Sequence, residues 1–409
     1  MKNTFRALAG RDFRLYFSGQ IVSLIGTWVQ QVAMSWIAYR ITGSPFMLGL
    51  IAFSGQIPML LATPLGGVLA DKFHKRNILL YVEIAELLLA IVLTVIAWQQ
   101  AFEPWILISA SVLLGLFAAI ELPSRQAFIT EIIHDRSVMS NAIALNSLTF
   151  NTARLFGPAV AGVILAVFNE PACFAVNVLS YAASIFTLLS IKPKAVAKTR
   201  VAGTFAEALV YLRQFDPAFW LVITVAVTSL CISPFMTFMP FYAKDVFDGG
   251  PDLLGTLLGA SGAGTLIAAL YLANRKSVLG LGNTIVLGCI MNGIAAVGFS
   301  YNTLQTLALP LLVMSGAAFI ITVTSCNILL QSLVKEHLRA RVMAIYTMSF
   351  VGMLPVGSLV YGGLAHIIGV QPVFVIAGVI ALVFSYLLWR LLPDLRSQGL
   401  PVLSSNGII

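Results

Sequence analysis

The sequence predicts an all-α membrane protein whose twelve transmembrane helices form two six-helix pseudo-repeats. Three observations carry this prediction: the composition, the length of the apolar stretches and the positions of the basic residues. Of the 409 residues, 59% are hydrophobic and 10% are charged, whereas soluble domains carry about 25% charged residues. Because a chain in lipid must satisfy its backbone hydrogen bonds internally, each spanning stretch is expected to be a helix.

The apolar stretches are long enough to cross a bilayer, which takes about 20 residues for each helix. Shorter polar or basic segments separate them and are expected to form the loops. The predicted spans are residues 15–40, 46–70, 78–98, 104–124, 141–168, 171–191, 217–243, 253–273, 280–301, 304–330, 341–367 and 371–391.

The lysines and arginines gather in alternate loops along the chain. If both termini are cytoplasmic, all but three of the 24 lie in segments on that side, the exceptions being Arg40, Arg154 and Lys244. The positive-inside rule therefore predicts that both termini are cytoplasmic. Since this topology accounts for the net charge of +8, no nucleic-acid partner is expected.

A basic segment in the middle divides the chain into two halves. We expect an N-terminal six-helix bundle at 1–191, a cytoplasmic basic linker at 192–216, a C-terminal six-helix bundle at 217–392 and a cytoplasmic tail at 393–409. Residues 204–215 alternate apolar and polar side chains at helical spacing, which predicts a helix on the membrane surface. The halves repeat short motifs, such as Leu48-Gly49 with Leu254-Gly255, and Ala161-Gly162 with Gly362-Gly363.

The turn between the second and third spans combines glycines, one acid and a basic cluster. Gly66 and Gly67 are expected to let helices approach closely just before it. Asp71 places a lone carboxylate at a helix end, where a helix N-terminus or an arginine can hold it. The basic residues, which fix the side of the membrane on which the turn lies, are Lys72, Lys75 and Arg76.

Four charged residues lie inside or at the ends of predicted spans, where charge is unfavourable and marks function by default. Glu83 and Glu86 are neighbours on one helix face, so one of the two is expected to hold a proton near neutral pH. Glu121 and Arg154 are the other two candidates for proton coupling. The alternative is structural: Glu83 reaches the interface, Glu86 bonds to a neighbouring helix, and Glu121 pairs with Arg125 or Arg154.

The fifth span carries a proline between small residues. Pro158 removes a backbone donor and can kink the helix, while Gly157 and Gly162 permit close packing against a partner helix. We expect these three residues to form a hinge between conformational states. Ordinary tight packing of membrane helices is the alternative.

Polar residues in otherwise apolar spans are the candidates for lining a substrate cavity. Gln20, Thr27 and Gln31 return to nearly the same face of the first span, and Asn146 and Asn327 add amides in the fifth and tenth spans. An apolar cavity with few fixed charges would suit an amphipathic organic molecule. Hydrogen bonds between helices are the alternative for each residue taken singly.

Soluble-enzyme signatures are absent from the sequence. There is no Gly-x-x-x-x-Gly-Lys-Ser/Thr phosphate loop, which argues against transport driven by ATP, and no nucleophile–base spacing that would indicate an enzyme. We expect no cofactor and no metal site. The cysteines lie within predicted spans and lack metal-ligand spacing, so packed free thiols are expected at Cys173, Cys231, Cys289 and Cys326.

The turn at Gly66–Arg76 resembles the loop between the second and third helices of the major facilitator superfamily of transporters. The N-terminal run extends the likeness to the enterobactin-exporter-like branch of that superfamily, and further motifs carry it through both halves. The matching residues are Arg11-Asp12-Phe13-Arg14-Leu15-Tyr16, Ser18-Gly19-Gln20, Gly26-Thr27-Trp28, Thr42-Gly43-Ser44-Pro45, Pro123-Ser124-Arg125 and Arg341-Val342-Met343-Ala344.

This resemblance implies the major facilitator fold and a bacterial inner-membrane exporter of siderophores or drug-like molecules, with proton antiport as the expected drive. It implies a conformational latch formed by Gly67, Asp71, Lys75 and Arg76, and it favours Glu121 because the fourth helix lines the central path. We expect a monomer whose partners are a small-molecule substrate and the lipid bilayer. The alternatives are a lipid or lysophospholipid transporter of the same fold, and a membrane sensor or assembly protein that does not transport.

Overall fold

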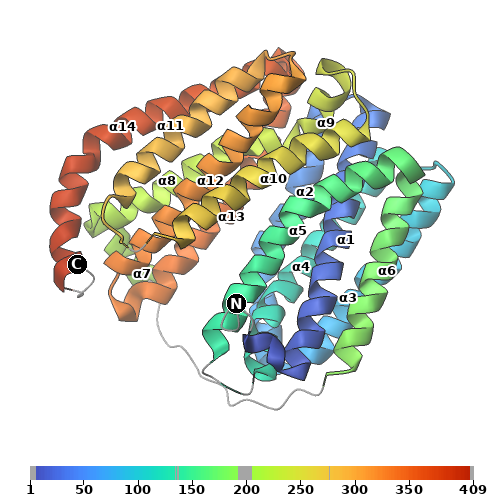
Figure 1. Ribbon diagram of the computed structural model, residues 1–409, viewed down its shortest axis with the longest axis horizontal. Helices are drawn as coiled ribbons and strands as arrows, with labels where there is room; N and C mark the ends of the chain where they lie inside the picture. The colour runs from blue at the N-terminus through green and yellow to red at the C-terminus, as the bar shows by residue number, and fades with distance from the viewer. Residues whose placement is uncertain (1–5, 134, 136–137, 192–204, 276, 406–409) are drawn as a thin grey trace. The chain divides into compact units, whose positions relative to one another are not determined.

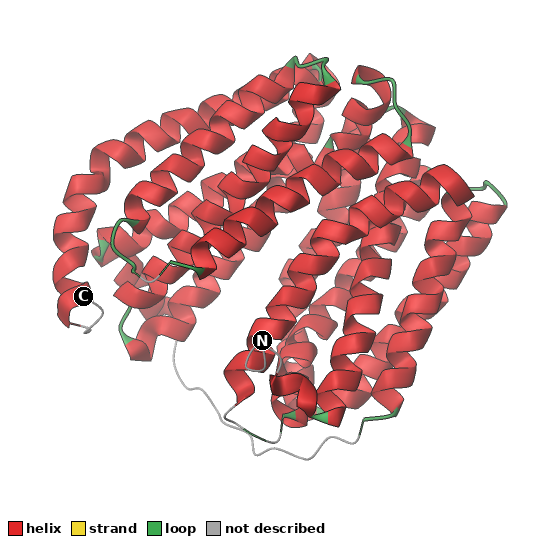
Figure 2. Cartoon of the chain, viewed as in Figure 1, coloured by secondary structure: helices red, strands yellow, loops and turns green. Residues whose placement is uncertain are grey.

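The computed structural model describes residues 6–133, 135, 138–191, 205–275 and 277–405. Over these residues the chain is helical and contains no β-strand (Figure 2). Twelve of the described helical segments are long and apolar enough to cross a membrane. The predicted fold class, an all-α multi-pass membrane protein, is therefore confirmed.

Where the connections are fully described, they are short (Figure 1). In chain order they are η1 (Arg6–Ala9), α1 (Arg11–Thr42), α2 (Pro45–Lys72), α3 (Lys75–Trp98), α4 (Pro104–Ile132), α5 (Met139–Phe168), α6 (Glu170–Leu189), α7 (Phe205–Gln214), α8 (Asp216–Thr237), α9 (Met239–Phe241), the π-helical turn η3 (Tyr242–Val246), α10 (Pro251–Ala273), α11 (Leu281–Ser300), α12 (Gln305–Leu333), α13 (Glu336–Ile368) and α14 (Val370–Ser405).

The connection between α1 and α2 shows how local sequence fixes a helix boundary. Gly43 adopts the left-handed conformation, with φ +58°, and its N–H bonds to the carbonyl of Tyr39. Only glycine adopts this conformation without a steric penalty, so α1 ends here. Ser44 then caps α2 by accepting a hydrogen bond from the Met47 N–H, and Pro45 occupies the first turn, where its missing N–H is not needed.

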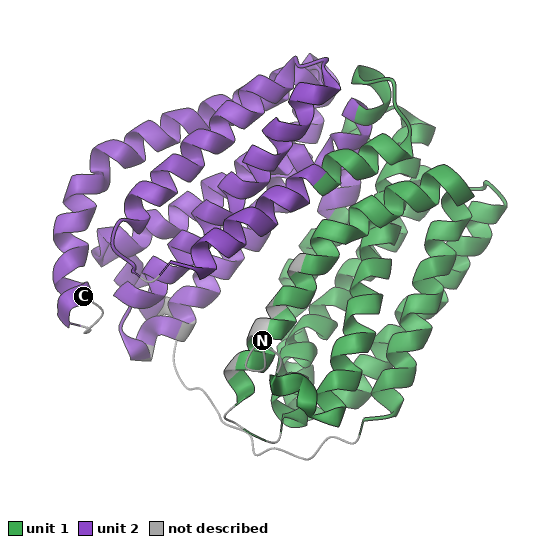
Figure 3. Cartoon of the chain, viewed as in Figure 1, with its two compact units in different colours: residues 1–47, 54–200, 243–259 green, residues 48–53, 201–242, 260–409 purple. Residues whose placement is uncertain are grey.

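The chain forms two compact units, each a bundle of helices (Figure 3). Unit 1 comprises Met1–Met47, Ser54–Arg200 and Ala243–Gly259, and unit 2 comprises Leu48–Phe53, Val201–Tyr242 and Ala260–Ile409. Within unit 1, α1 packs against α5 and α6, while α3 packs against α4 and α6. Within unit 2, α8 packs against α12, α13 and α14, and α11 packs against α12 and α14.

Small residues set the spacing of helices in unit 1. At Gly26 of α1, a Cβ atom would collide with the side chains of Ser180 and Asn177 on α6. At Gly66 of α2, a Cβ atom would lie 2.9 Å from the Cα of Ile120 on α4. Gly66 therefore permits the close approach expected before the basic turn, whereas a Cβ atom at Gly67 would meet nothing within 4 Å.

The amphipathic segment after the linker forms α7 and packs on unit 2. Ala208 and Leu212 are buried in an apolar cluster with residues of α8, α12 and α13. Glu207 forms an ion pair with Arg341 of α13. Protein thus covers part of the apolar surface of the helix expected on the membrane surface, while Leu209 and Val210 are exposed. Most of the preceding linker, residues 192–204, lies outside the described part of the chain.

All four cysteines are free and buried, which confirms the prediction of packed thiols. Among the described residues, no group of three or more His, Cys, Asp or Glu side chains is arranged to hold a metal ion.

Candidate functional site

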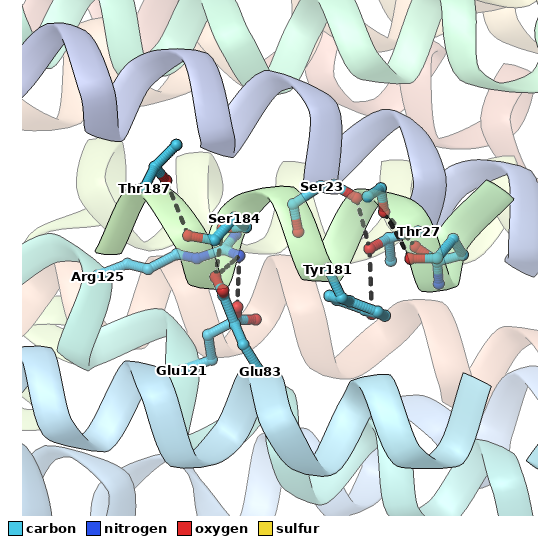
Figure 4. A network of polar contacts seen from close by, with 10 residues as sticks. Ser23, Thr27, Glu83, Glu121, Arg125, Tyr181, Ser184 and Thr187 are labelled. Carbon is cyan, nitrogen blue, oxygen red and sulfur yellow. Dashed lines mark hydrogen bonds and ion pairs between the residues drawn. The ribbon is translucent and has the colours of Figure 1, made fainter. Parts of the chain in front are cut away.

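A cluster of three carboxylates and one guanidinium lies inside unit 1, between α3, α4 and α6. Glu83, Glu86, Glu121 and Arg125 are 2%, 5%, 8% and 6% exposed. Glu83 and Glu86 are three residues apart on α3, and Glu121 and Arg125 are four apart on α4, so each pair shares one helix face. Figure 4 shows the side chains of Glu83, Glu121 and Arg125 pointing toward one another.

The guanidinium of Arg125 holds the cluster together. It forms an ion pair with Glu121, and its Nη2 lies 3.8 Å from Oε1 of Glu83. On the other side, Ser184 of α6 donates a 2.8 Å hydrogen bond to the same Glu83 oxygen. Two buried atoms, Nε of Arg125 and Oε2 of Glu83, have no hydrogen-bond partner among the described residues.

Glu86 differs from the other two acids in its surroundings. Among the described residues, no basic group forms an ion pair with it, and its hydrogen-bonding neighbour is the phenol of Tyr181 on α6. The hydroxyl of Tyr181 also lies 3.3 Å from Oγ1 of Thr27 on α1. Glu86 is therefore connected through two hydroxyl groups to the first helix.

The cluster is unbalanced in charge. If all three acids were ionised, a single guanidinium would face three buried carboxylates, and like charges in a low-dielectric interior repel strongly. Tyr16 of α1 lies close enough to interact electrostatically with Arg125, Glu121 and Glu83, and its buried hydroxyl has no hydrogen-bond partner in the described part of the chain. An exchangeable proton on one carboxyl group is the simplest way to relieve the imbalance.

Arg125 was predicted only as one of two alternative partners of Glu121, and the structure shows the Glu121–Arg125 ion pair. The predicted fourth span ends at residue 124, and Arg125 was counted among the basic residues of a cytoplasmic loop. That assignment is wrong, because α4 continues to Ile132 and buries Arg125 against the acids. The four-residue spacing between Glu121 and Arg125 is the sequence signal for this pair, because residues four apart share one face of a helix. Arg154, the other alternative partner of Glu121 and a candidate for proton coupling, is a half-buried residue of α5.

The residues of the predicted latch have separate contacts. Asp71 lies exposed in the last turn of α2. Nζ of Lys75 forms a 2.8 Å ion pair with Glu131 at the end of α4. Arg76 donates hydrogen bonds of 2.8 and 2.7 Å to the carbonyls of Leu188 and Leu189, the last residues of α6. The two basic residues thus fasten α3 to α4 and α6.

The predicted hinge lies in a continuous helix. α5 runs through Pro158 without interruption. Gly162 contacts α10 within unit 1, since a Cβ atom there would lie 2.8 Å from the Cα of Gly255, and Gly157 lies against Trp28 of α1. The glycines are thus at close helix contacts, and their role as a hinge remains a prediction.

The predicted cavity residues of α1 have different environments. Gln20 is buried, and its Nε2 has no hydrogen-bond partner among the described residues. Thr27 donates a 3.0 Å hydrogen bond to the carbonyl of Ser23 and faces Tyr181. Gln31 is exposed. Thr27 is therefore held against α6, whereas the amides of Gln20 and Gln31, at the two ends of the polar stripe, are available for other contacts.

The amides predicted on other spans are partly accessible. Asn146 of α5 and Asn327 of α12 are half-buried, and Asn327 accepts a 2.6 Å hydrogen bond from Gln331 one turn later. A buried amide pair was not predicted: the side chain of Asn177 on α6 donates a 2.8 Å hydrogen bond to the amide oxygen of Gln30 on α1.

Comparison with known proteins identifies similar chains over nearly the full length. Residues 2–401 match the family described as "Transmembrane secretion effector", a model of the major facilitator superfamily. The "Staphyloferrin A transporter" of Staphylococcus aureus is 26% identical, with 90% of this chain and 92% of the relative covered. The "Multidrug efflux pump Tap" of Mycobacterium tuberculosis is 22% identical, with coverage of 98% and 97%.

Solved structures with low sequence identity share the fold. The nucleoside transporter NupG superposes with a TM-score of 0.73 at 14% identity, covering 93% of this chain and 99% of the other. A bacterial homologue of the lysosomal transporter Spinster gives a TM-score of 0.73 at 13% identity, with coverage of 96% and 98%.

Proposed function

Because the chain belongs to the transmembrane secretion effector family of the major facilitator superfamily, we propose that it exports a small amphipathic organic molecule in exchange for protons. The protein is a membrane transporter and not an enzyme. We propose that it lies in a bacterial inner membrane with both termini in the cytoplasm, which the basic residues in alternate loops support, and that it acts as a monomer.

The charge imbalance of the buried cluster is the observation that carries this proposal. Transporters of this fold bind substrate near the midplane and alternate between two accessible states. A buried carboxyl group that takes up a proton in one state and releases it in the other couples the two movements. The cluster of Glu83, Glu86, Glu121 and Arg125 has one cation for three acids, so a single proton changes its balance of attraction and repulsion.

The three acids have different roles in this proposal. Glu83 anchors Arg125, because it also accepts the hydrogen bond from Ser184. Glu86 and Glu121 share the exchangeable proton, since no basic residue in the described part of the chain forms an ion pair with Glu86 and Glu121 competes with Glu83 for Arg125. Loading a proton on Glu121 would weaken its pair with Arg125 and free α4 to change its contacts.

Substrate class follows from the relatives and the polar residues. One similar protein is named for staphyloferrin A and others for macrolide or multidrug efflux, which supports a siderophore-like or drug-like cargo. Gln20, Gln31 and Asn146 are the residues that we propose for contact with it. Asp71 is the residue that we propose to bias the inward and outward states, in the sense of a population shift.

Transport in inside-out vesicles tests the proposal. Siderophores, macrolides, cationic dyes and a lysophospholipid are each offered with and without a pH gradient. We expect gradient-dependent uptake of at least one of the first three, which a protonophore abolishes. In Glu86→Gln and Glu121→Gln vesicles the gradient should no longer drive uptake, while exchange of substrate down its own gradient persists. Uptake that survives collapse of the pH gradient, or movement of the lysophospholipid alone, would overturn the proposal.

A further inference from the structure

Unit 2 contains an apolar pocket that the proposed transport mechanism does not use. Its volume is about 310 Å³, which is at the lower end of the roughly 300–1,000 Å³ typical of small-molecule sites. The walls come from α8, α11, α12 and α14 and from the loop before α11, and they include Trp220, Ile285, Leu333, Leu388 and Leu392.

Two arginines lie at one end of this pocket. Arg396 of α14 is a lining residue, and its Nη2 donates a 2.7 Å hydrogen bond to the amide oxygen of Asn283. Arg275 donates to Oγ1 of Thr284 at 2.9 Å and to the carbonyl of Leu279, itself a lining residue. All of these acceptors are neutral. Among the described residues, no carboxylate forms an ion pair with either guanidinium.

The pocket has a way in at the arginine end. Leu279 and Leu400, both of which line it, are 50% and 42% exposed. Arg396 is exposed as well. An apolar chain can therefore pass between the leucines while a charged head remains beside the guanidinium groups.

We propose that this pocket holds an acyl chain of an anionic phospholipid, whose phosphate is bound by Arg396 and Arg275. A chain in a bilayer is surrounded by lipid, so an apolar pocket at its rim is filled by an acyl chain in preference to water. Basic pockets between transmembrane helices attract anionic head groups, which are enriched on the cytoplasmic side. The loop that carries Arg275 lies on that side in the proposed topology.

The polar pattern of the walls favours a lipid over a transported substrate. Thr224 contributes a hydroxyl to the lining, and this group already donates a 2.7 Å hydrogen bond to the Trp220 carbonyl. The charged groups are confined to the end beside Leu279. A single cationic end with an apolar interior matches the division of a phospholipid into phosphate and acyl chain, and it leaves no fixed polar group to orient a compact polar molecule.

Trp220 makes the proposal testable by fluorescence, because it is a wall residue and bromine atoms quench indole emission on contact. The full-length protein is reconstituted in phosphatidylcholine nanodiscs that contain increasing fractions of phosphatidylglycerol with brominated acyl chains. A parallel series uses brominated phosphatidylcholine. The Trp220 signal is the difference between the wild type and Trp220→Phe, which removes the contribution of the other five tryptophans.

We expect half-maximal quenching of Trp220 at a mole fraction of phosphatidylglycerol about thirtyfold below that of phosphatidylcholine, because two basic residues near an anionic head group contribute roughly 1 kcal/mol each. Arg396→Gln should reduce this preference to about fivefold, because Arg275 remains. Arg390→Gln is the matched control, because Arg390 is an exposed arginine of the same helix that stacks on Tyr386 outside the pocket, and it should keep the preference.

Equal quenching by the two lipids in the wild type would identify the pocket as part of the unselective lipid annulus and overturn the proposal. An unchanged preference in Arg396→Gln would overturn the assignment of the phosphate to Arg396. Neither outcome depends on transport, so the result is independent of the substrate and of proton coupling.

Discussion

Replacement of Arg125 by glutamine should destabilise unit 1 strongly, because it leaves three buried acids without a cation. The side chains of Arg125 and Glu83 are 7% and 3% exposed, and their charged atoms are 3.8 Å apart. At an effective dielectric constant of about 20, unit charges at this distance attract by roughly 4 kcal/mol. Breaking a buried pair by removing one partner typically destabilises by about 3–5 kcal/mol.

This change in free energy predicts a large shift in melting temperature. At about 2–4 °C per kcal/mol for a unit of this size, Arg125→Gln should melt roughly 6–20 °C below the wild type. A thiol-reactive dye measures it on detergent-purified protein in which Cys231, Cys289 and Cys326 of unit 2 are replaced by alanine. The remaining thiol, that of Cys173 on α6, is buried and becomes reactive when unit 1 unfolds. Arg11→Gln is the control, since that side chain is 70% exposed, and should leave the melting temperature unchanged.

The second arm of the experiment removes the repulsion. Arg125→Gln/Glu121→Gln deletes one acid together with the cation and should recover part of the lost stability. The deficit of the single variant should also be smaller in acidic than in alkaline buffer, because protonation neutralises the acids that the arginine no longer balances. A single variant as stable as the wild type, or a double variant no more stable than the single, would refute the proposed electrostatic role of Arg125.

Two further predictions concern the turn between α2 and α3. Gly66→Ala should lower the free energy of unfolding by about 1–3 kcal/mol, because the new methyl group would overlap the backbone of α4. Gly67→Ala is the control, because a methyl group at that position meets nothing within 4 Å. Equal melting temperatures for the two variants would contradict this packing. Asp71→Asn should lower transport in vesicles. Its free energy of unfolding should change by no more than the roughly 0.5 kcal/mol typical of exposed sites, so the melting temperature should stay close to that of the wild type. The neighbouring exposed variant Lys72→Gln should leave transport intact, and equal flux in the two variants would remove Asp71 from the switching mechanism.

Local sequence predicts the number and type of helices well, because a spanning helix depends on properties of a single segment. Length, apolarity and the sign of the flanking charges are all local. The glycine at position 66 was also predictable as a point of close contact. Which neighbour it contacts is a property of the folded unit, and this is why Gly66 and Gly67 look alike in sequence and differ in the structure.

The functional cluster was only half predictable. Three acids in apolar spans stand out against lipid, and their pairing on helix faces follows from spacing alone. Arg125 follows Pro123 at what looks like a helix end, where a basic residue normally marks a cytoplasmic loop. Its burial depends on Glu83 from another helix and on the continuation of α4 past the proline, and neither is visible within a window of local sequence.

The hydrogen bonds from Arg76 to the end of α6 have a mechanical consequence for the cluster. They fasten the first turn of α3 to α6, and the bond between Ser184 and Glu83 fastens the two helices again further along. A helix pair held together at two points is expected to move as one body, so in the proposed mechanism α3 and α6 form a rigid surface beside the acid that exchanges a proton. The ion pair between Lys75 and Glu131 joins the end of α4 to the same surface, so in the proposed mechanism a change of protonation would displace the part of α4 that carries Glu121 and Arg125.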